Sequence, residues 1–363
     1  MKKIIISLAM IVAVGAVVVG ATRAYFSDTE TSTGNMITSG ALDLTLNGKN
    51  GEVVTAVVNI EDMKPSQTWY SGPITLEVFN NPGKLYKHVV APFECTGGER
   101  TEPECEAESG QWDGATCTGG TPVDDLPRVT WFDLEVWNDK NQNEEIEEDE
   151  WEIIIPDGMI TVEDIASHWI YLGEYGEQLQ MNKIVIRQSF HMDGEAGNEF
   201  QGDSCTFTEE FKVLQTNAPH PENTLATLKL DNKDPQTWDP INDSKVGYLT
   251  YNTAGATFDY TFTGQGLVAG TEYSLIYYAD GYPGNNPGAL IGTMITDGSG
   301  NVNASGSTEL GMNLPHSSDA NYPDGAKIWL VPSTGYAEST NSVTPWAPAD
   351  YLYEMNLIQY EDQ

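Results

Sequence analysis

The chain has few basic residues and few histidines. It holds 17 Lys and Arg against 54 Asp and Glu, a formal net charge of −37, and its 363 residues include five histidines. Such an acidic surface repels the phosphates of nucleic acids and of anionic membranes, so we expect neither as a partner. The H-E-x-x-H motif of zinc peptidases and the G-x-S-x-G turn of hydrolases are both absent. We therefore expect a protein that is not an enzyme.

Long apolar runs are also lacking, except at the N-terminus. Two lysines precede an uncharged stretch at residues 4–21, and Thr22-Arg23-Ala24 then places small residues where a signal peptidase reads. We expect a signal peptide at residues 1–24, cut between Ala24 and Tyr25, and hence a secreted protein. The alternative is a permanent anchor, because the apolar stretch just reaches the length of a membrane span. The membrane would then be a partner only through this uncleaved segment.

Cysteine is scarce, with four residues in the chain: Cys95, Cys105, Cys117 and Cys205. An even number in an exported protein predicts two disulfides, for which three pairings exist. Cys105 and Cys117 flank a turn-rich loop, and their pairing would leave Cys95 for Cys205. A zinc site is the alternative, but the spacing has no C-x-x-C and no histidine is near.

Short alternating runs, separated by Gly, Asn, Asp and Pro, fill most of the chain. This pattern is typical of an all-β sandwich or barrel. In the first part we expect strands at residues 42–46, 53–60, 74–79, 129–137, 151–155, 183–190 and 206–215. One short helix is predicted, because Thr161 and Asp164 form a capping box, Trp169 shares a face with Ile165, and Gly173 would end it.

The length suffices for two domains, each with its own core. Residues 216–224, TNAPHPENT, carry two prolines and no hydrophobic period. We place the first β-sandwich at residues 25–217, a linker at 218–224 and the second domain at 225–363. The second should have strands at 226–230, 246–251, 257–263, 272–278, 289–296, 326–331 and 352–360, with a hairpin turn at Thr296–Val302. Seven strands in about 140 residues suit an immunoglobulin-like sandwich.

An acidic run at residues 139–150 has the ligand spacing of a calcium loop. Calcium takes six to eight oxygen ligands from alternating side chains, a backbone carbonyl and a final bidentate carboxylate. The positions are filled by Asp139, Asn141, Asn143, Glu145 through its carbonyl, Glu147 and Glu150. Ile146 is predicted to attach the loop to the core, whereas Glu144 stands where glycine is usual. Strand-like flanks favour a structural calcium site in a hairpin loop; a solvated acidic loop is the alternative.

Three stretches together resemble a known family. They are Tyr25-Phe26-Ser27-Asp28 with residues 39–44, residues 58–67 with 74–81, and residues 197–202 with 207–215. Over about residues 1–217 the chain resembles the TasA/camelysin family of secreted bacterial surface and biofilm-matrix proteins. The resemblance implies a jelly-roll sandwich.

The same resemblance implies self-association into fibres. The freed N-terminal segment, here Tyr25–Leu46, would complete the sheet of the next copy. The alternative is that this segment is the first strand of its own domain. Camelysin-type relatives have been classed as metallopeptidases, so a peptidase is a second possible function.

Aromatic residues in loops of the second half indicate a third possibility. Tyr282 and Trp346 lie in Pro- and Gly-rich segments and could stack on sugar rings. Cell-surface polysaccharide is therefore a further candidate partner.

Overall fold

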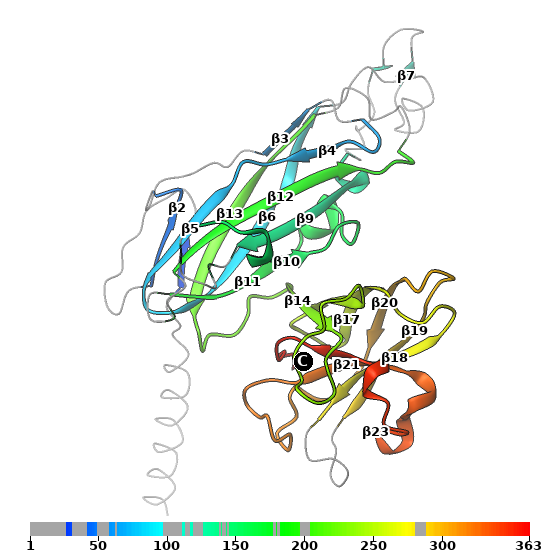
Figure 1. Cartoon of the computed structure of the whole chain (residues 1–363). Coiled ribbons are helices and arrows are strands. Elements are labelled where there is room, and N and C mark those ends of the chain that lie inside the picture. The colour runs from blue at the N-terminus through cyan, green and yellow to red at the C-terminus, as the bar shows by residue number, and fades with distance from the viewer. Residues whose placement is uncertain are drawn as a thin grey trace, which may run out of the picture.

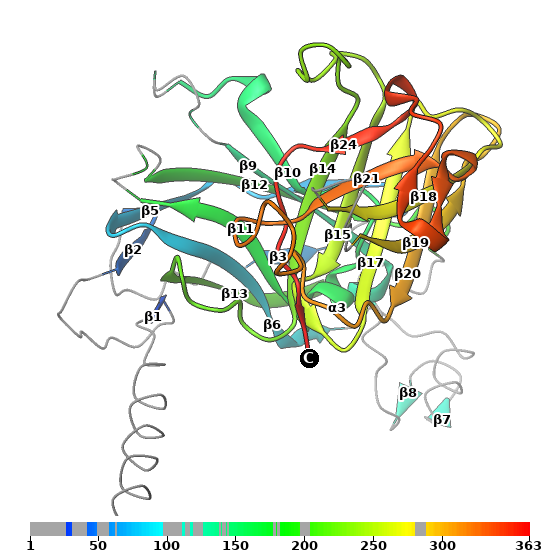
Figure 2. The same cartoon turned by 90° about the horizontal axis from the view of Figure 1, so that it is seen from below.

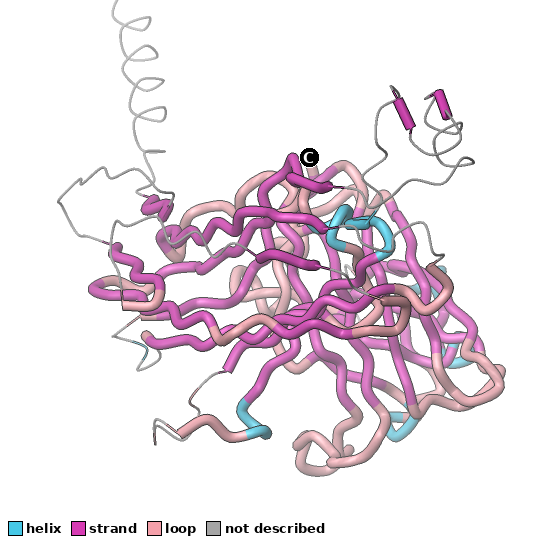
Figure 3. The backbone as a smooth tube through the Cα atoms, turned by 90° about the horizontal axis from the view of Figure 1, so that it is seen from above, coloured by secondary structure: helices cyan, strands magenta, loops and turns pink. Residues whose placement is uncertain are grey.

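Strands are the predominant secondary structure of the computed structural model, with one short α-helix in the part of the chain that it describes (Figures 1 and 3), as the sequence predicts for an all-β protein. The described residues are 27–30, 42–48, 58–61, 64–96, 111–112, 117–118, 126–137, 139, 143, 145–176, 179, 182–196, 204–279 and 288–363. Ala24, Tyr25, Cys105, Asn141 and Tyr282 lie outside them. Among the described residues, no helix has both the length and the apolar character needed to cross a bilayer.

The first half consists of two facing antiparallel sheets. One sheet has the order β10 (Trp151–Ile155), β9 (Thr130–Trp137), β12 (Lys183–Met192), β5 (Ile74–Asn80) and β2 (Leu42–Leu46), with β4 (Thr68–Tyr70) beside β12. The other has the order β1 (Ser27–Glu30), β13 (Ser204–Gln215), β6 (Gly83–Thr96) and β11 (Trp169–Tyr175), and β3 (Val58–Glu61) also pairs with β13.

Strand alternation determines which side chains fill the space between these two sheets. In β9, Phe132, Leu134 and Val136 are fully buried, whereas Asp133 and Glu135 between them point to the other face. The same period places Leu44, Leu76, Ile186 and Phe211 in one core. Burial of this apolar surface is the main stabilising contribution to the sandwich.

The second half forms two further groups of strands around a core of its own. One group has the order β20 (Val302–Thr308), β17 (Phe258–Gln265), β15 (Val246–Asn252) and β14 (Thr224–Asp231), and the other β24 (Leu352–Glu354), β21 (Lys327–Pro332), β18 (Glu272–Tyr278) and β19 (Ala289–Ile295). Backbone pairing of Leu230 with Glu354 connects the two groups. The core contains Leu249, Phe262, Leu275 and Leu330.

Short elements complete the described structure. The paired segments are β7 (Gln111–Trp112) with β8 (Cys117–Thr118), β16 (Ala254–Gly255) with β25 (Glu361–Asp362), and β22 (Tyr336–Ala337) with β23 (Ser342–Val343). The helical elements are α3 (Val162–Ile165) and 3-10 turns at Leu126–Val129, Glu148–Glu150, Ser333–Gly335, Glu338–Thr340 and Pro348–Asp350.

The two halves are joined by backbone pairing. Parallel pairing of Trp169 with Thr224 and of Ile170 with Leu225 connects β11 to β14, so one sheet continues through both halves (Figure 2). The predicted linker is packed against this junction. Ala218 is buried, and its carbonyl accepts a hydrogen bond of 3.2 Å from Lys84 Nζ.

The predicted end of the helix and the predicted hairpin are both wrong. The helix begins as predicted, with the Thr161 hydroxyl accepting the amide of Asp164 at 3.2 Å, but it ends at Ile165 instead of Gly173. Residues from Trp169 onward form β11, because they pair with β6 and β14 and tertiary contacts override the local pattern.

The second correction concerns the predicted hairpin at Thr296–Val302. The turn is present, since Asp297 N and Gly300 N donate to Asn301 O and Asp297 O at 2.7 and 3.2 Å. The flanking strands, however, pair with different neighbours, β19 with β18 and β20 with β17. The turn therefore connects the two groups of strands, and β20 was not among the predicted strands.

Candidate functional site

A groove lies on the outer face of the sheet that contains β9 and β12. Its volume is about 260 Å³, and its lining includes Asp133, Asp157, His191, Ser189 and Tyr70. Asp133 and His191 are outward residues of β9 and β12, and Asp157 follows β10 in a turn. Antiparallel pairing sets Asp133 opposite Ser189, which brings His191 close to it diagonally.

Three potential metal ligands converge in this groove. One ligand atom from each of Asp133, Asp157 and His191 lies within 4.8 Å of the others. His191 Nδ1 is 3.1 Å from Asp157 Oδ1 and 3.8 Å from Asp133 Oδ2. Among the described residues this is the one such group of three or more His, Cys, Asp or Glu side chains.

Asp133 is the most constrained member of the group. Burial raises the pKa of its carboxyl and Asp157 raises it further, while the Ser189 hydroxyl, which donates to Oδ2 at 2.8 Å, and His191 oppose the rise. Its Oδ1 is buried and has no hydrogen-bond partner in the described part of the chain. Nearby Glu135 is already paired with Arg187 and is not a free ligand. Two carboxylates and one imidazole form a ligand set that suits Zn²⁺ or Mn²⁺.

Sequence reasoning missed this group of ligands. Asp133, Asp157 and His191 have no characteristic spacing, and only the register between β9 and β12 brings the first and third together. The sequence signal that could have found the group is the alternation of polar ligand residues with apolar residues in both strands.

Hydrogen bonds connect some of the predicted calcium ligands to one another. The Asp139 carboxylate accepts the amide of Asn143 at 3.0 Å, and Asn143 Nδ2 donates to Glu147 Oε1 at 3.4 Å. The Asn143 side-chain oxygen accepts the amide of Glu145 at 2.7 Å. Asn141 lies outside the described residues.

Glu150, the predicted final ligand, is in a different environment. It is only 3% exposed, and its Oε2 accepts a hydrogen bond of 2.9 Å from Trp137 Nε1. Ile146 is 56% exposed, so the prediction that it attaches the loop to the core is wrong; the surrounding acidic residues keep this segment in solvent. Calcium binding at this loop stays a prediction.

The cysteines are described in part. Cys205 is disulfide-bonded and buried on β13. The register sets Cys95 of β6 directly opposite Cys205. Cys117 begins β8. The pairing of Cys95 with Cys205 and of Cys105 with Cys117 stays a prediction.

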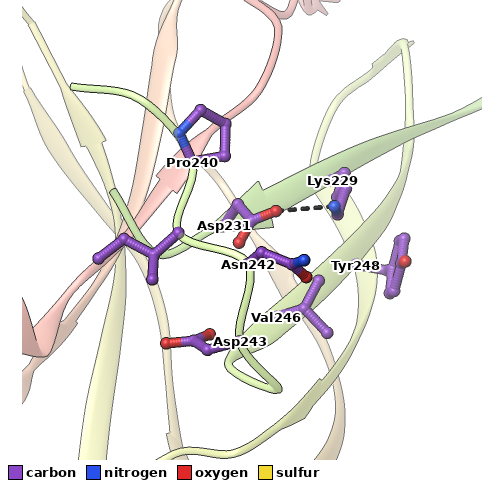
Figure 4. Close-up of a pocket in the computed structure, with 8 residues that line it drawn as sticks. Lys229, Asp231, Pro240, Asn242, Asp243, Val246 and Tyr248 are labelled. Atoms are coloured by element: carbon purple, nitrogen blue, oxygen red, sulfur yellow. Dashed lines mark ion pairs between the residues drawn. The ribbon is translucent and has the colours of Figure 1, made fainter. Parts of the chain in front are cut away.

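Of the two aromatic residues predicted to bind sugars, Trp346 lies within the described part of the chain. Its side chain is 51% exposed, with its ring 5.9 Å from that of Trp329 and 5.6 Å from that of Tyr351. A separate pocket of about 310 Å³ is lined by Lys229, Asp231, Pro240, Ile241, Asn242, Asp243, Val246 and Tyr248 (Figure 4). Lys229 Nζ is 2.7 Å from Asp231 Oδ2 there, so these charges neutralise each other.

Comparisons with known proteins support the resemblance for the N-terminal part. Residues 1–81 match the family model described as camelysin metallo-endopeptidase, which confirms the predicted resemblance over that stretch. No curated protein matches the chain significantly.

A further match is found among solved structures. It is the N-terminal CBM22-1–CBM22-2 tandem domain from Paenibacillus barcinonensis Xyn10C, at 10% identity, covering 92% of this chain and 99% of that chain. Its TM-score of 0.18 is too low to support any conclusion about this protein.

Proposed function

We propose that this protein is a secreted surface or matrix protein, and that it assembles into fibres by exchange of its N-terminal strand. The observation that carries the proposal is the position of β1. This strand pairs with β13 through four residues, Ser27–Glu30 against Phe211–Leu214, at the outer edge of the sheet. The match to the camelysin family model covers the same segment.

The edge of β13 is suited to such an exchange. Its outer side is occupied by β3 at Ser204–Phe207 and by β1 at Phe211–Leu214, while its inner side pairs with β6. A copy of Ser27–Glu30 from another molecule would make the same backbone hydrogen bonds as the chain's own strand. The exchanged and the unexchanged forms therefore have nearly the same contact energy. The exchanged form becomes favoured as the protein concentration rises.

A covalent lock on β1 tests this proposal. Thr29 lies opposite Lys212, so a disulfide formed by Thr29→Cys with Lys212→Cys should hold β1 on its own β13. The mature protein is expected to form fibres at high concentration, seen by negative-stain microscopy, and the locked variant is expected to stay monomeric. A cysteine pair at Thr227 and Thr250, which face each other in β14 and β15, is the matched control and should still assemble.

Two outcomes would reject strand exchange. One is a wild-type protein that remains monomeric at every concentration, with and without calcium. The other is a locked variant that assembles as well as the control. The charge of −37 makes it necessary to vary ionic strength, because copies repel each other when little salt is present.

A metal-dependent peptidase is the second candidate, and the ligand group in the groove is the observation that favours it. Asp133, Asp157 and His191 supply the number and type of ligands that catalytic zinc sites use, and Asp133 Oδ1 has no hydrogen-bond partner among the described residues. Bound zinc would supply Lewis-acid chemistry to a peptide carbonyl. The chain's own residues would hold the metal and orient Asp133 through the Ser189 hydroxyl.

Zinc binding is measurable without any assay of activity. Calorimetry is expected to show one zinc ion per chain, and His191→Gln should weaken binding at least ~10-fold because one of three ligands is lost. His168→Gln is the control, since His168 contacts Ser167 and Asp164 outside the groove. Equal binding by both variants, or casein left intact by the zinc-loaded wild type, would exclude the peptidase.

A further inference from the structure

Three polar side chains are enclosed between the two sheets of the first half. Lys87 of β6, Gln188 of β12 and Glu209 of β13 are 0%, 2% and 4% exposed. The Lys87 amine lies over the rings of Phe132 and Phe211, at 5.4 and 5.7 Å from their centroids. A charged lysine is seldom placed among aromatic rings in a core, because removal of the ammonium from water is costly.

The carboxylate of Glu209 brings the other two groups together. Lys87 Nζ and Gln188 Nε2 both donate to the same oxygen, Glu209 Oε1, the second at 2.8 Å. Two hydrogen bonds to one atom place the amine and the side-chain amide no more than about 6 Å apart. Lys87 and Gln188 come from opposite sheets, so the group spans the core.

Two oxygens of this group lack partners. Glu209 Oε2 and Gln188 Oε1 are buried and accept no hydrogen bond from the described residues. The two ends of a glutamine amide are equivalent in shape, so rotation by 180° would direct Gln188 Oε1 toward Glu209. That contact is favourable when the carboxyl of Glu209 carries a proton, which would also polarise the amide carbonyl.

The surroundings favour a neutral amine, which is the nucleophilic form of lysine. Burial lowers the pKa of Lys87, and Glu209 opposes this shift in part. The proton released by the ammonium can pass to Glu209 along their hydrogen bond. That transfer would leave a neutral amine beside a neutral acid, both adjacent to an amide.

We propose that Lys87 and Gln188 become joined by an intramolecular amide bond, with Glu209 as the catalytic acid and base. The Lys87 nitrogen attacks Gln188 Cδ, and the carbonyl oxygen receives the proton of Glu209. Glu209 then takes a proton from the attacking nitrogen. Glu209 passes that proton to Nε2, and the bond from Cδ to Nε2 breaks as the carbonyl re-forms, so that ammonia leaves. The proton on the carbonyl oxygen returns to Glu209.

This reaction balances without any cofactor. The lysine amine and the glutamine amide give a secondary amide and ammonia, Glu209 ends as it began, and no electrons are exchanged with an oxidant or reductant. The product would connect β6 covalently to β12 and so link the two sheets. A link of this type would hold the sandwich together under load or in denaturant, and the proposal is independent of strand exchange.

Mass spectrometry tests the proposal on the purified full chain after reduction and alkylation. The intact mass is expected to be about 17 Da below the mass calculated from the sequence with its cysteines alkylated, owing to the lost ammonia. Trypsin should fail to cleave after Lys87, and the branched peptide should join Lys87 to the peptide that contains Gln188. Fragmentation is needed because succinimide formation at Asn47-Gly48 would remove the same mass.

Variants identify the role of each residue. Glu209→Ala and Gln188→Leu are expected to carry the full mass, and circular dichroism shows whether they fold. Glu210→Ala is the matched control, because Glu210 lies next in β13 near His88, outside the buried group, and should keep the mass loss. A folded wild type with the full mass, or with the loss located at Asn47, would overturn the proposal. So would a cross-link that persists in Glu209→Ala.

Discussion

His220→Gln is expected to make the protein more resistant to acid than the wild type. His220 Nδ1 and the Tyr86 hydroxyl are 3.1 Å apart and hydrogen-bonded, and the imidazole packs edge-on against Tyr86 and Tyr171 at centroid distances of 5.8 and 5.2 Å. Burial, with a smaller contribution from the charge of Lys84, lowers the pKa of His220 from 6.5 to about 3. The native state therefore holds this imidazole neutral.

The sign of the effect follows from proton binding. Between pH 6.5 and 3 the unfolded chain binds a proton at His220 that the native chain does not, so stability falls as the pH falls. The full loss is about 4–5 kcal/mol, and about 3 kcal/mol of it is present at pH 4. Glutamine does not titrate but can still accept from Tyr86, and so should avoid most of this loss.

Urea unfolding at pH 7 and pH 4 measures the difference between wild type and variant. The carboxylates of the chain titrate in the same range, but they are common to both proteins and cancel. His316→Gln is the control, because His316 contacts Ser318 in the second half, away from the junction. Identical pH profiles for wild type and His220→Gln would show that His220 is not held neutral in the native state.

Glu354→Gln is expected to stabilise the protein above pH 7. Glu354 ends β24 opposite Leu230, and burial raises the pKa of its carboxyl from 4.5 to about 7, with Lys233 and Lys327 opposing the rise. The Trp329 side chain also opposes the rise, but its Nε1 and the buried Oε2 of Glu354 do not meet in hydrogen-bond geometry, and Oε2 has no other partner in the described structure. The ionised side chain is therefore poorly compensated.

The raised pKa of Glu354 lowers the free energy of unfolding at high pH. Between pH 4.5 and 7 the native chain binds a proton that the unfolded chain has lost, so stability falls as the pH rises and stays low above pH 7. The loss is at most about 3 kcal/mol, and the neutral amide of glutamine would recover much of it. Little change is expected at pH 4.5.

Thermal or urea unfolding at pH 5 and pH 8 measures this effect. Glu361→Gln, at an exposed position of β25, is the matched control and should leave both values nearly unchanged. A Glu354→Gln variant that is less stable than the wild type at pH 8 would mean that Lys233 and Lys327 compensate the charge fully.

The sequence was sufficient to predict the class of fold and many strands. Leu42, Leu44 and Leu46 alternate with polar residues, and β2 has the predicted bounds because period-two burial is a local property. The Thr161 cap is also local, and it starts the helix where expected. The register of β6 and β13, with Cys95 opposite Cys205, could not be read from either segment alone.

Other features were beyond sequence reasoning because they depend on residues far apart in the chain. Ser189 and Asp133 are separated by 56 positions, and no spacing rule connects them or adds Asp157 to the group. Trp169 fits a helix by its local pattern, yet pairing with β6 and β14 makes it part of a strand. The acidic loop shows the opposite case, in which a convincing local spacing leaves Ile146 in solvent and Glu150 bonded to Trp137.

The apolar faces of the strands and the start of the helix follow from neighbouring residues, and the strong acidity follows from composition, so all three can be read from the chain before it folds. Which polar side chains meet depends instead on how distant strands pair and pack. Lys87 and Glu209 are 122 positions apart, and they contact each other because antiparallel register sets β6 beside β13. A periodic pattern specifies a face of a strand, but the partner across the core is chosen by packing and by hydrogen-bond register over the whole sheet.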